Sequence, residues 1–185
     1  MMYEEMIEDE TFIDGMQTRI ISDQEMDTMY IPDVEYMNSD EIRRVLQILV
    51  PRKRMMENEK YSLIVYVQGS AWHKQNVYQH VGQFNYLCKQ GFVVAIVQYR
   101  ESDLAPFPAQ IEDTKTAIRF LKKHHEEYFV DEQNVFLFGD SSGGHVALVS
   151  GLTAKLPLFN GNLYSEYSNE VRAIIDFYGV VDITM

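Results

Sequence analysis

A single cysteine, Cys88, stands among the 185 residues of this chain. Because a disulfide needs two cysteines, the chain forms none internally, and its composition gives no sign of an oxidising compartment. The N-terminus lacks the basic start and the apolar run of a secretory signal. No apolar stretch approaches the ~18 residues of a membrane-spanning helix. These absences predict a cytoplasmic protein with no membrane partner.

Basic residues are also scarce, since 16 lysines and arginines face 28 aspartates and glutamates, for a formal charge of −12. That sign argues against binding to nucleic acid or to an anionic membrane surface. Residues 1–41 contain 13 acidic residues and one basic residue, Arg19, so they carry the whole imbalance. We therefore expect an acidic N-terminal arm over 1–41 and a neutral globular domain over 42–185. Within the arm, residues 1–33 would be frayed or would form short strands on the domain.

Hydrophobic residues make up 46% of the chain and charged residues 24%, which is typical of a soluble globular protein, and the length suits one domain. Apolar strand patterns alternate with amphipathic helix patterns along most of the sequence. Strands are expected at 43–50, 61–67, 92–99, 135–139 and 172–178, helices at about 75–90, 108–127 and 142–152, and a surface loop at 157–170. This alternation predicts an α/β fold in which a mostly parallel sheet is covered by helices on both faces.

Residues 139–143 read Gly-Asp-Ser-Ser-Gly, a match to the G-x-S-x-G pattern of a nucleophile elbow. The match follows a predicted buried strand and opens a predicted helix, which is the context that the pattern requires. On such a turn Ser141 would be the nucleophile, while Gly139 and Gly143 leave space where a Cβ would clash. The N–H of Ser142, at the start of the helix, would stabilise an oxyanion during acyl transfer. The alternative is that Ser141 only caps the helix.

A second oxyanion donor is expected from the loop that follows the strand at 61–67. This loop, at 68–72, has small residues that allow its backbone to approach a substrate. The backbone N–H groups of Ser70 and Ala71 are the candidates, and one such donor is typically worth ~10²–10³ in rate. The same stretch is also compatible with an ordinary turn between a strand and a helix.

Other chemistries lack their sequence patterns. Chymotrypsin-like proteases carry Gly-Asp-Ser-Gly-Gly, but this chain has an extra serine and predicted helices in place of two β-barrels. The glycines at 139–144 fit neither a dinucleotide-binding G-x-G-x-x-G nor a phosphate loop. No cluster of cysteines and histidines has the spacing of a metal site. We therefore expect no cofactor and no metal.

Four stretches carry a family resemblance. They are Val-Tyr-Val-Gln-Gly-Ser-Ala-Trp at 65–72, Tyr-Arg at 99–100 with Phe-Pro-Ala-Gln-Ile-Glu-Asp at 107–113, Gly-Asp-Ser-Ser-Gly-Gly-His at 139–145, and Asp-Phe-Tyr-Gly at 176–179. As a set they resemble an α/β-hydrolase of the esterase/lipase type, closest to its hormone-sensitive-lipase-like and feruloyl or acetyl-xylan-esterase-like branches. The resemblance implies a serine hydrolase that acts on a small carboxylic ester. Gln68, Ser70 and Ala71 replace a histidine and two glycines of the usual loop, which backbone donors should tolerate.

The resemblance also implies a catalytic acid and a histidine after two later strands, which would follow residue 185. Among the histidines present, His145 is expected to point away from Ser141, while His73 could approach the mouth of the site. Asp182 is interpreted as structural. We therefore expect the N-terminal part of a hydrolase fold, nearly inactive by itself because Ser141 lacks a base.

Two alternatives stay open. The chain could be a non-catalytic binding or regulatory protein that associates with itself through a sheet edge exposed at residue 178. It could also be an arylformamidase-like or peptidase-like relative, because the residues that would select the substrate are mostly absent from the sequence.

Overall fold

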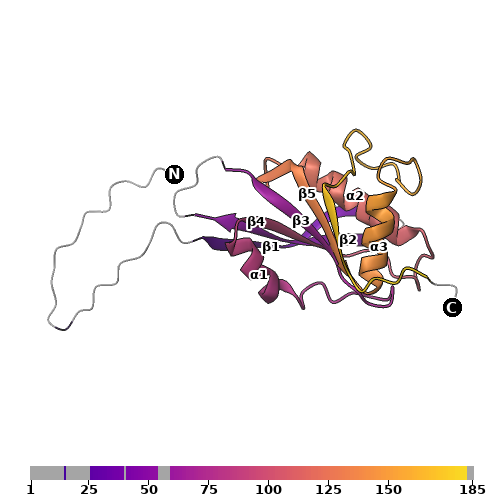
Figure 1. The fold of residues 1–185 in the computed structure, drawn as a ribbon, viewed down its shortest axis with the longest axis horizontal. Helices are drawn as coiled ribbons and strands as arrows, with labels where there is room; N and C mark the ends of the chain where they lie inside the picture. Colours follow the sequence, from indigo (N-terminus) through magenta and orange to yellow (C-terminus); the bar gives the residue numbers. More distant parts are fainter. Residues whose placement is uncertain (1–14, 16–25, 40, 54–58, 183–185) are drawn as a thin grey trace.

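The computed structural model describes residues 15, 26–39, 41–53 and 59–182. Predicted features on other residues, among them most of the acidic arm, lie outside the described residues. The elements follow one another along the chain as Figure 1 shows. Their bounds are β1 (Asp27–Ser39), β2 (Ile42–Arg52), β3 (Tyr61–Val67), α1 (Val81–Lys89), β4 (Phe92–Val97), α2 (Ala109–Lys123), β5 (Val130–Asp140), α3 (Ser142–Leu152) and β6 (Ala173–Phe177).

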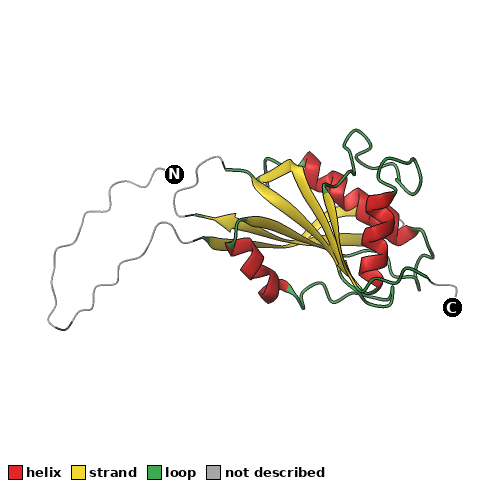
Figure 2. Ribbon diagram, viewed as in Figure 1, coloured by secondary structure: helices red, strands yellow, loops and turns green. Residues whose placement is uncertain are grey.

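These strands form one sheet in the order β1-β2-β4-β3-β5-β6. Strands β4, β3, β5 and β6 run parallel to one another, while β2 is antiparallel to both β1 and β4. Helix α1 lies on one face, and α2 and α3 pack together on the other (Figure 2). The prediction of an α/β fold with a mostly parallel sheet and helices on both faces is confirmed.

The central strand β3 shows why its sequence is a continuous apolar run. Successive side chains of a strand point to opposite faces of the sheet. Leu63 and Val65 belong to the core under α2 and α3, whereas Ile64 packs with Phe84 and Cys88 of α1. Both faces of the strand are therefore buried, and neither leaves room for the polar residues of a half-exposed strand.

The acidic N-terminal segment enters the sheet. Its residues Asp27–Ser39 form β1, which pairs antiparallel with β2. The buried Tyr36 side chain fixes this strand, because its hydroxyl donates a 2.7 Å hydrogen bond to the Gln98 carbonyl oxygen. The described part of the segment is therefore a strand laid on the domain, and the boundary predicted at residue 41 falls inside the β1–β2 hairpin.

Helix α1 is shorter than the helix predicted at about 75–90, because it begins at Val81. The buried Gln75 side chain bridges two loops instead of starting a helix. Its Nε2 donates to the His73 carbonyl oxygen at 2.6 Å, and its Oε1 accepts from the Tyr99 N–H at 3.1 Å. These two bonds hold the chain before α1 in turns.

The remaining elements lie near their predicted positions. Strand β3 and helix α3 have the predicted bounds, and α2 ends at Lys123 rather than at about residue 127. Strand β5 begins at Val130 rather than at residue 135, because Val130 pairs with Tyr61 of β3. Among the described residues, no helix combines the length and the apolar character needed to cross a membrane.

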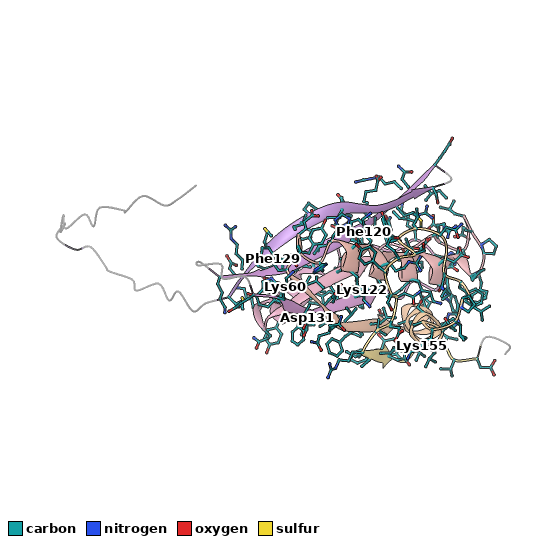
Figure 3. The ribbon with its side chains drawn as sticks, turned by 90° about the horizontal axis from the view of Figure 1, so that it is seen from above. Lys60, Phe120, Lys122, Phe129, Asp131 and Lys155 are labelled. Carbon is teal, nitrogen blue, oxygen red and sulfur yellow. The ribbon has the colours of Figure 1, made fainter. Side chains whose placement is uncertain are left out.

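The loop between α3 and β6 contains the predicted surface loop at 157–170 and is held against α2 by basic side chains. The Lys115 ammonium donates to the Leu158 carbonyl oxygen at 2.7 Å. The ammonium of Lys122, a residue of α2 that Figure 3 labels, donates to the Glu170 carbonyl oxygen at 2.6 Å. Burial lowers the pKa of Lys115 to about 8. Hydrogen bonds from α2 therefore fix the path of this loop.

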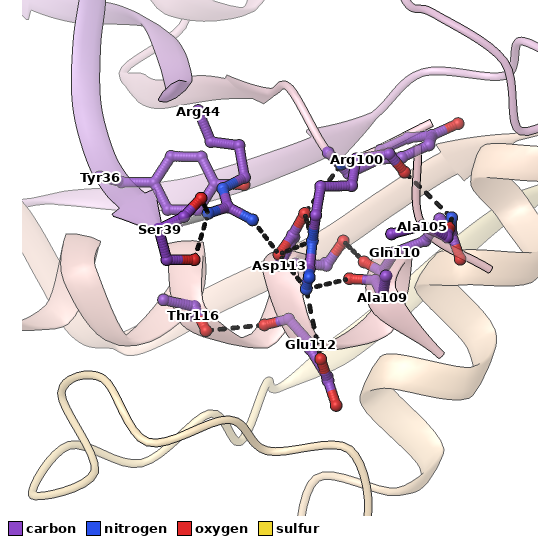
Figure 4. Close-up of polar contacts among 12 residues, drawn as sticks. Tyr36, Ser39, Arg44, Arg100, Ala105, Ala109, Gln110, Glu112, Asp113 and Thr116 are labelled. Atoms are coloured by element: carbon purple, nitrogen blue, oxygen red, sulfur yellow. Dashed lines mark hydrogen bonds and ion pairs between the residues drawn. The ribbon is translucent and has the colours of Figure 1, made fainter. Parts of the chain in front are cut away.

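A buried carboxylate, Asp113 on α2, joins β2 to the chain that follows β4 (Figure 4). The Nη1 of Arg44, a buried residue of β2, lies 3.4 Å from Asp113 Oδ1. The Nε of Arg100 donates to both carboxylate oxygens at 3.1 and 3.0 Å, and the Arg100 backbone N–H donates to Oδ2 at 2.8 Å. Two arginines thus share one carboxylate, and the cluster anchors the chain directly after Tyr99.

Candidate active site

Ser141 lies at the turn between β5 and α3, as the motif predicts. Its backbone φ of +51° is a left-handed value that few residues other than glycine adopt, and such strain is typical of a nucleophile elbow. The Ser141 N–H donates to the Phe177 carbonyl oxygen at 2.9 Å, and the His145 N–H donates to the Ser141 carbonyl oxygen at 3.2 Å. The backbone therefore fixes Ser141 between the carboxyl end of β5 and the N-terminus of α3.

The glycines around this turn are needed because the backbone is closely packed there. A Cβ on Gly139 would lie 2.3 Å from the Gly143 carbonyl oxygen, and a Cβ on Gly143 would lie 2.1 Å from the Val67 carbonyl oxygen. A Cβ on Gly69, in the adjacent loop, would lie 2.5 Å from the Asp140 carbonyl oxygen. Only glycine lets the loop at 68–72 and α3 approach each other this closely.

The loop at 68–72 is tied to the start of α3 by one hydroxyl group. The buried Ser142 Oγ accepts hydrogen bonds from the backbone N–H groups of Ser70 at 2.9 Å and Trp72 at 3.2 Å. The Ser70 N–H, predicted as an oxyanion donor, is therefore engaged by Ser142. In the described part of the chain the Ala71 N–H has no hydrogen-bond partner, and the Ser142 N–H, in the first turn of α3, has none within the helix.

Residues that the motif analysis missed also support this loop. The Asp140 carboxylate accepts from the Tyr66 hydroxyl at 2.6 Å and from the Gly69 N–H at 3.0 Å. The buried Tyr99 hydroxyl donates to the Gln68 carbonyl oxygen at 3.0 Å. Burial is the main cause that raises the pKa of both tyrosines, so they stay neutral donors. Asp140, Tyr66 and Tyr99 all stand in the stretches that carry the family resemblance, but the sequence analysis assigned none of them a role.

The two histidines weighed as bases are engaged elsewhere. The Trp72 Nε1 donates to His145 Nδ1 at 3.2 Å, and burial lowers the pKa of His145, so its ring is neutral. The Nδ1 of His73 lies 2.7 Å from the Asp103 carboxylate, and both side chains are largely exposed. Across the described residues, no side chain makes a hydrogen bond to the Ser141 hydroxyl, and no three histidine, cysteine or acidic side chains are grouped to hold a metal ion.

The sheet order, the strained serine turn after β5 and the loop beside it define an α/β-hydrolase of the esterase type. The sequence profile of the BD-FAE family matches residues 46–185, more than half of the chain. This chain belongs to that family.

Curated relatives agree with this assignment. The chain is 29% identical over 132 residues to the esterase LipC of Mycobacterium tuberculosis, a match that covers 71% of this chain and 33% of LipC. It is 32% identical over 119 residues to the probable carboxylic ester hydrolase LipM of the same organism, covering 64% of this chain and 27% of LipM. The printed names of these relatives are those of ester hydrolases, and this chain spans a third or less of their length.

Solved structures lead to the same class. Esterase 2 of Thermogutta terrifontis superimposes with a TM-score of 0.68 at 26% identity, over 79% of this chain and 52% of the esterase. A bifunctional GH43-CE protein of Bacteroides eggerthii superimposes with a TM-score of 0.72 at 32% identity, over 89% of this chain and 24% of that protein. The described fold is therefore the fold of part of these larger proteins.

Proposed function

We propose that Ser141 is the nucleophile of a carboxylic ester hydrolase. The left-handed Ser141 between β5 and α3 is the observation that carries the proposal. The Ser141 Oγ attacks the carbonyl carbon of a small ester and gives up its proton to a base, and the alcohol then leaves with a proton. Water cleaves the acyl-serine bond and releases the carboxylic acid, which restores the hydroxyl.

The oxyanion hole of this reaction is formed by backbone groups at the meeting point of the loop and α3. Ala71 and Ser142 supply the two N–H groups, and the positive end of the helix adds to their effect. The Ser142 hydroxyl holds the loop in place through Ser70 and Trp72. The bonds that the loop makes to the Asp140 carboxylate and to the Tyr99 hydroxyl keep the loop from moving away from Ser141.

Catalysis by this chain alone is slow under the proposal, because a serine without a base is a poor nucleophile. In a serine protease with a complete catalytic triad, loss of the histidine costs on the order of 10⁶ in kcat. The acylated serine would also be hydrolysed slowly, since the same base activates water. A trapped acyl group on Ser141 is therefore a better signature of the site than turnover.

We expect p-nitrophenyl acetate, with imidazole added as an external base, to acetylate Ser141. Mass spectrometry of the peptide that contains Ser141 should show the acetyl adduct in the wild type and not in Ser141→Ala. Ser165→Ala, in the exposed loop before β6, is the control and should keep the adduct. An adduct that persists in Ser141→Ala would overturn the proposed nucleophile. Turnover without imidazole that disappears in Ser141→Ala would overturn the claim that no described side chain acts as a base for Ser141.

A second candidate function, self-association, is favoured by the exposed edge of β6. In the described sheet β6 has a neighbour only in β5, and its side chains Ile175 and Phe177 are exposed, as is the following Tyr178. Unpaired strand edges with apolar side chains tend to pair with further chains. We propose that a second copy of this chain pairs with β6.

Phe177→Lys is expected to shift the chain from dimers toward monomers in sedimentation velocity, because a charge on an edge strand opposes pairing. Tyr86→Lys on α1 is the matched control, since Tyr86 is 69% exposed and Phe177 is 52% exposed. Tyr86→Lys should sediment like the wild type. A wild type that stays monomeric as its concentration is raised, or equal shifts in both variants, would rule out pairing through β6.

A further inference from the structure

A polar pocket lies between α2 and the loop at 153–172, and the function described above does not use it. Its volume is about 200 Å³. Its lining includes Arg119 of α2 and the loop residues Asn160, Ser165, Tyr167, Ser168 and Asn169. Arg119 is the one charged residue among the described residues that line it. None of these residues belongs to the turn around Ser141 or to the loop at 68–72, so the pocket is separate from the candidate active site.

Arg119 is a buried cation whose partners are all neutral, and only 2% of it is exposed. Its Nε donates to the Leu163 carbonyl oxygen at 2.9 Å. Its Nη2 donates to the Thr116 hydroxyl at 3.1 Å and to the Asn160 carbonyl oxygen. Within the described residues, Nη1 has no hydrogen-bond partner and no carboxylate forms an ion pair with the guanidinium. A buried charge normally has a charged partner, because neutral groups replace only part of its lost hydration.

A second buried cation, Lys115, lies one helical turn before Arg119. Its ammonium is bonded to three neutral oxygens of the loop, at 2.9, 2.7 and 3.1 Å. Burial, and to a smaller extent the charge of Arg119, lowers the pKa of Lys115, while burial lowers the pKa of Arg119. Glu166 attracts Arg119 from outside the pocket lining. Two positive charges therefore act on this pocket, and an anion in it would be attracted to both.

The loop adds neutral hydrogen-bond donors to the same pocket. The Ser168 Oγ accepts from the Glu170 N–H at 3.0 Å, so its own proton is free to donate. The Nδ2 of the buried Asn169 has two protons and donates to Asn160 Oδ1 at 3.0 Å, which leaves one proton for a ligand. A cation surrounded by hydroxyl and amide donors matches a ligand that has a negative charge and several acceptor oxygens.

We propose that this pocket binds a phosphate group, either as the free ion or on a small organic molecule. A phosphate group carries a charge of about −1.5 to −2 at neutral pH and three acceptor oxygens or more. The pocket volume of about 200 Å³ is several times the ~30 Å³ of one water molecule, which is enough for a phosphate group with a short attached chain. Because α2 and the loop both contact it, bound phosphate would stabilise the folded chain.

Isothermal titration calorimetry of the full chain tests the proposal with two probes, inorganic phosphate and glycerol phosphate. Sodium chloride keeps the ionic strength constant, so that general screening does not differ between samples. At least one probe should bind saturably. Tighter binding of inorganic phosphate would assign the pocket to the free ion, and tighter binding of glycerol phosphate would assign it to a phosphate monoester. If neither probe binds saturably, the proposal is wrong.

Arg119→Gln should weaken phosphate binding roughly tenfold or more, because hydrogen bonds to a charged group are the strong ones. Lys123→Gln is the matched control, since Lys123 lies on the same helix one turn further along and is exposed, but does not line the pocket. It should keep the affinity of the wild type. Equal weakening in both variants would mean that phosphate responds to the overall charge of α2, which would overturn the assignment to the pocket.

Ser168→Asp tests the pocket without removing a buried group, in case Arg119→Gln fails to fold. An aspartate can still accept from the Glu170 N–H, and its carboxylate would repel phosphate, so binding should be lost. Asn162→Asp adds the same charge to the same loop at an exposed residue outside the pocket lining, and should bind phosphate like the wild type. Wild-type affinity in Ser168→Asp, or equal loss in both variants, would rule out this pocket as the phosphate site.

Discussion

Replacement of Asp113 by asparagine is expected to lower the free energy of unfolding by about 3–5 kcal/mol. The Asp113 carboxylate is fully buried and is shared by Arg44 and Arg100. Asparagine keeps the shape of the side chain but removes its charge, so two guanidinium groups are left in a buried cluster with less countercharge. Breaking a buried pair costs far more than an exposed pair is worth, because the remaining charge cannot regain its hydration.

Glu112→Gln is the matched control, since Glu112 is the neighbouring acid on α2 and also binds Arg100, at 3.2 Å. Its side chain is about one-third exposed, so the expected loss is below about 1 kcal/mol. Urea unfolding followed by circular dichroism gives both free energies. If Asp113→Asn and Glu112→Gln lowered the free energy of unfolding equally, burial would not determine how much the Asp113 ion pairs contribute to stability.

The parts of the fold that could be predicted are those determined by the local pattern of apolar residues. Strand β3 is buried on both faces and therefore reads as an unbroken apolar run, and α3 begins immediately after a motif with its own signature. Strand β1 has no such run. Acidic residues such as Asp33 and Glu35 break up its apolar residues. The place of β1 in the sheet depends on pairing with β2, which the local sequence does not predict.

The candidate site divides in the same way. The strand–turn–helix context of Ser141 is local, and the motif located it correctly. The partner of the Ser70 N–H is not local, because Ser142 lies 72 residues further along the chain. The same holds for Asp113, which is 69 residues from Arg44. The spacing of the motif residues indicates which backbone N–H groups could face a substrate. Only the folded chain shows which of these N–H groups already donate a hydrogen bond to a side chain.

Gly143→Ala is expected to destabilise the fold by about 3 kcal/mol or more, at the upper end of the cost of overpacking. Its Cβ would lie 2.1 Å from the Val67 carbonyl oxygen, and that atom belongs to β3, the central strand of the sheet. Because the added Cβ is fixed to the backbone of α3 and the carbonyl oxygen belongs to the backbone of β3, no side chain can rotate away to relieve the contact. Helix α3 would have to move from β3, and the bonds from Ser142 to the loop would lengthen.

Gly82→Ala is the opposite control, because Gly82 is an exposed glycine in α1 whose added Cβ meets nothing within 4 Å. There alanine should stabilise the chain by about 0.5–1 kcal/mol, through the better helix propensity of alanine. Trp72 emission separates the local effect from the global one, since the Trp72 N–H is bonded to Ser142 Oγ. Under native conditions it should change in Gly143→Ala and stay unchanged in Gly82→Ala. If Gly143→Ala kept both the stability and the emission of the wild type, α3 would not approach β3 this closely, and the argument that α3 holds the loop at 68–72 in place would fail with it.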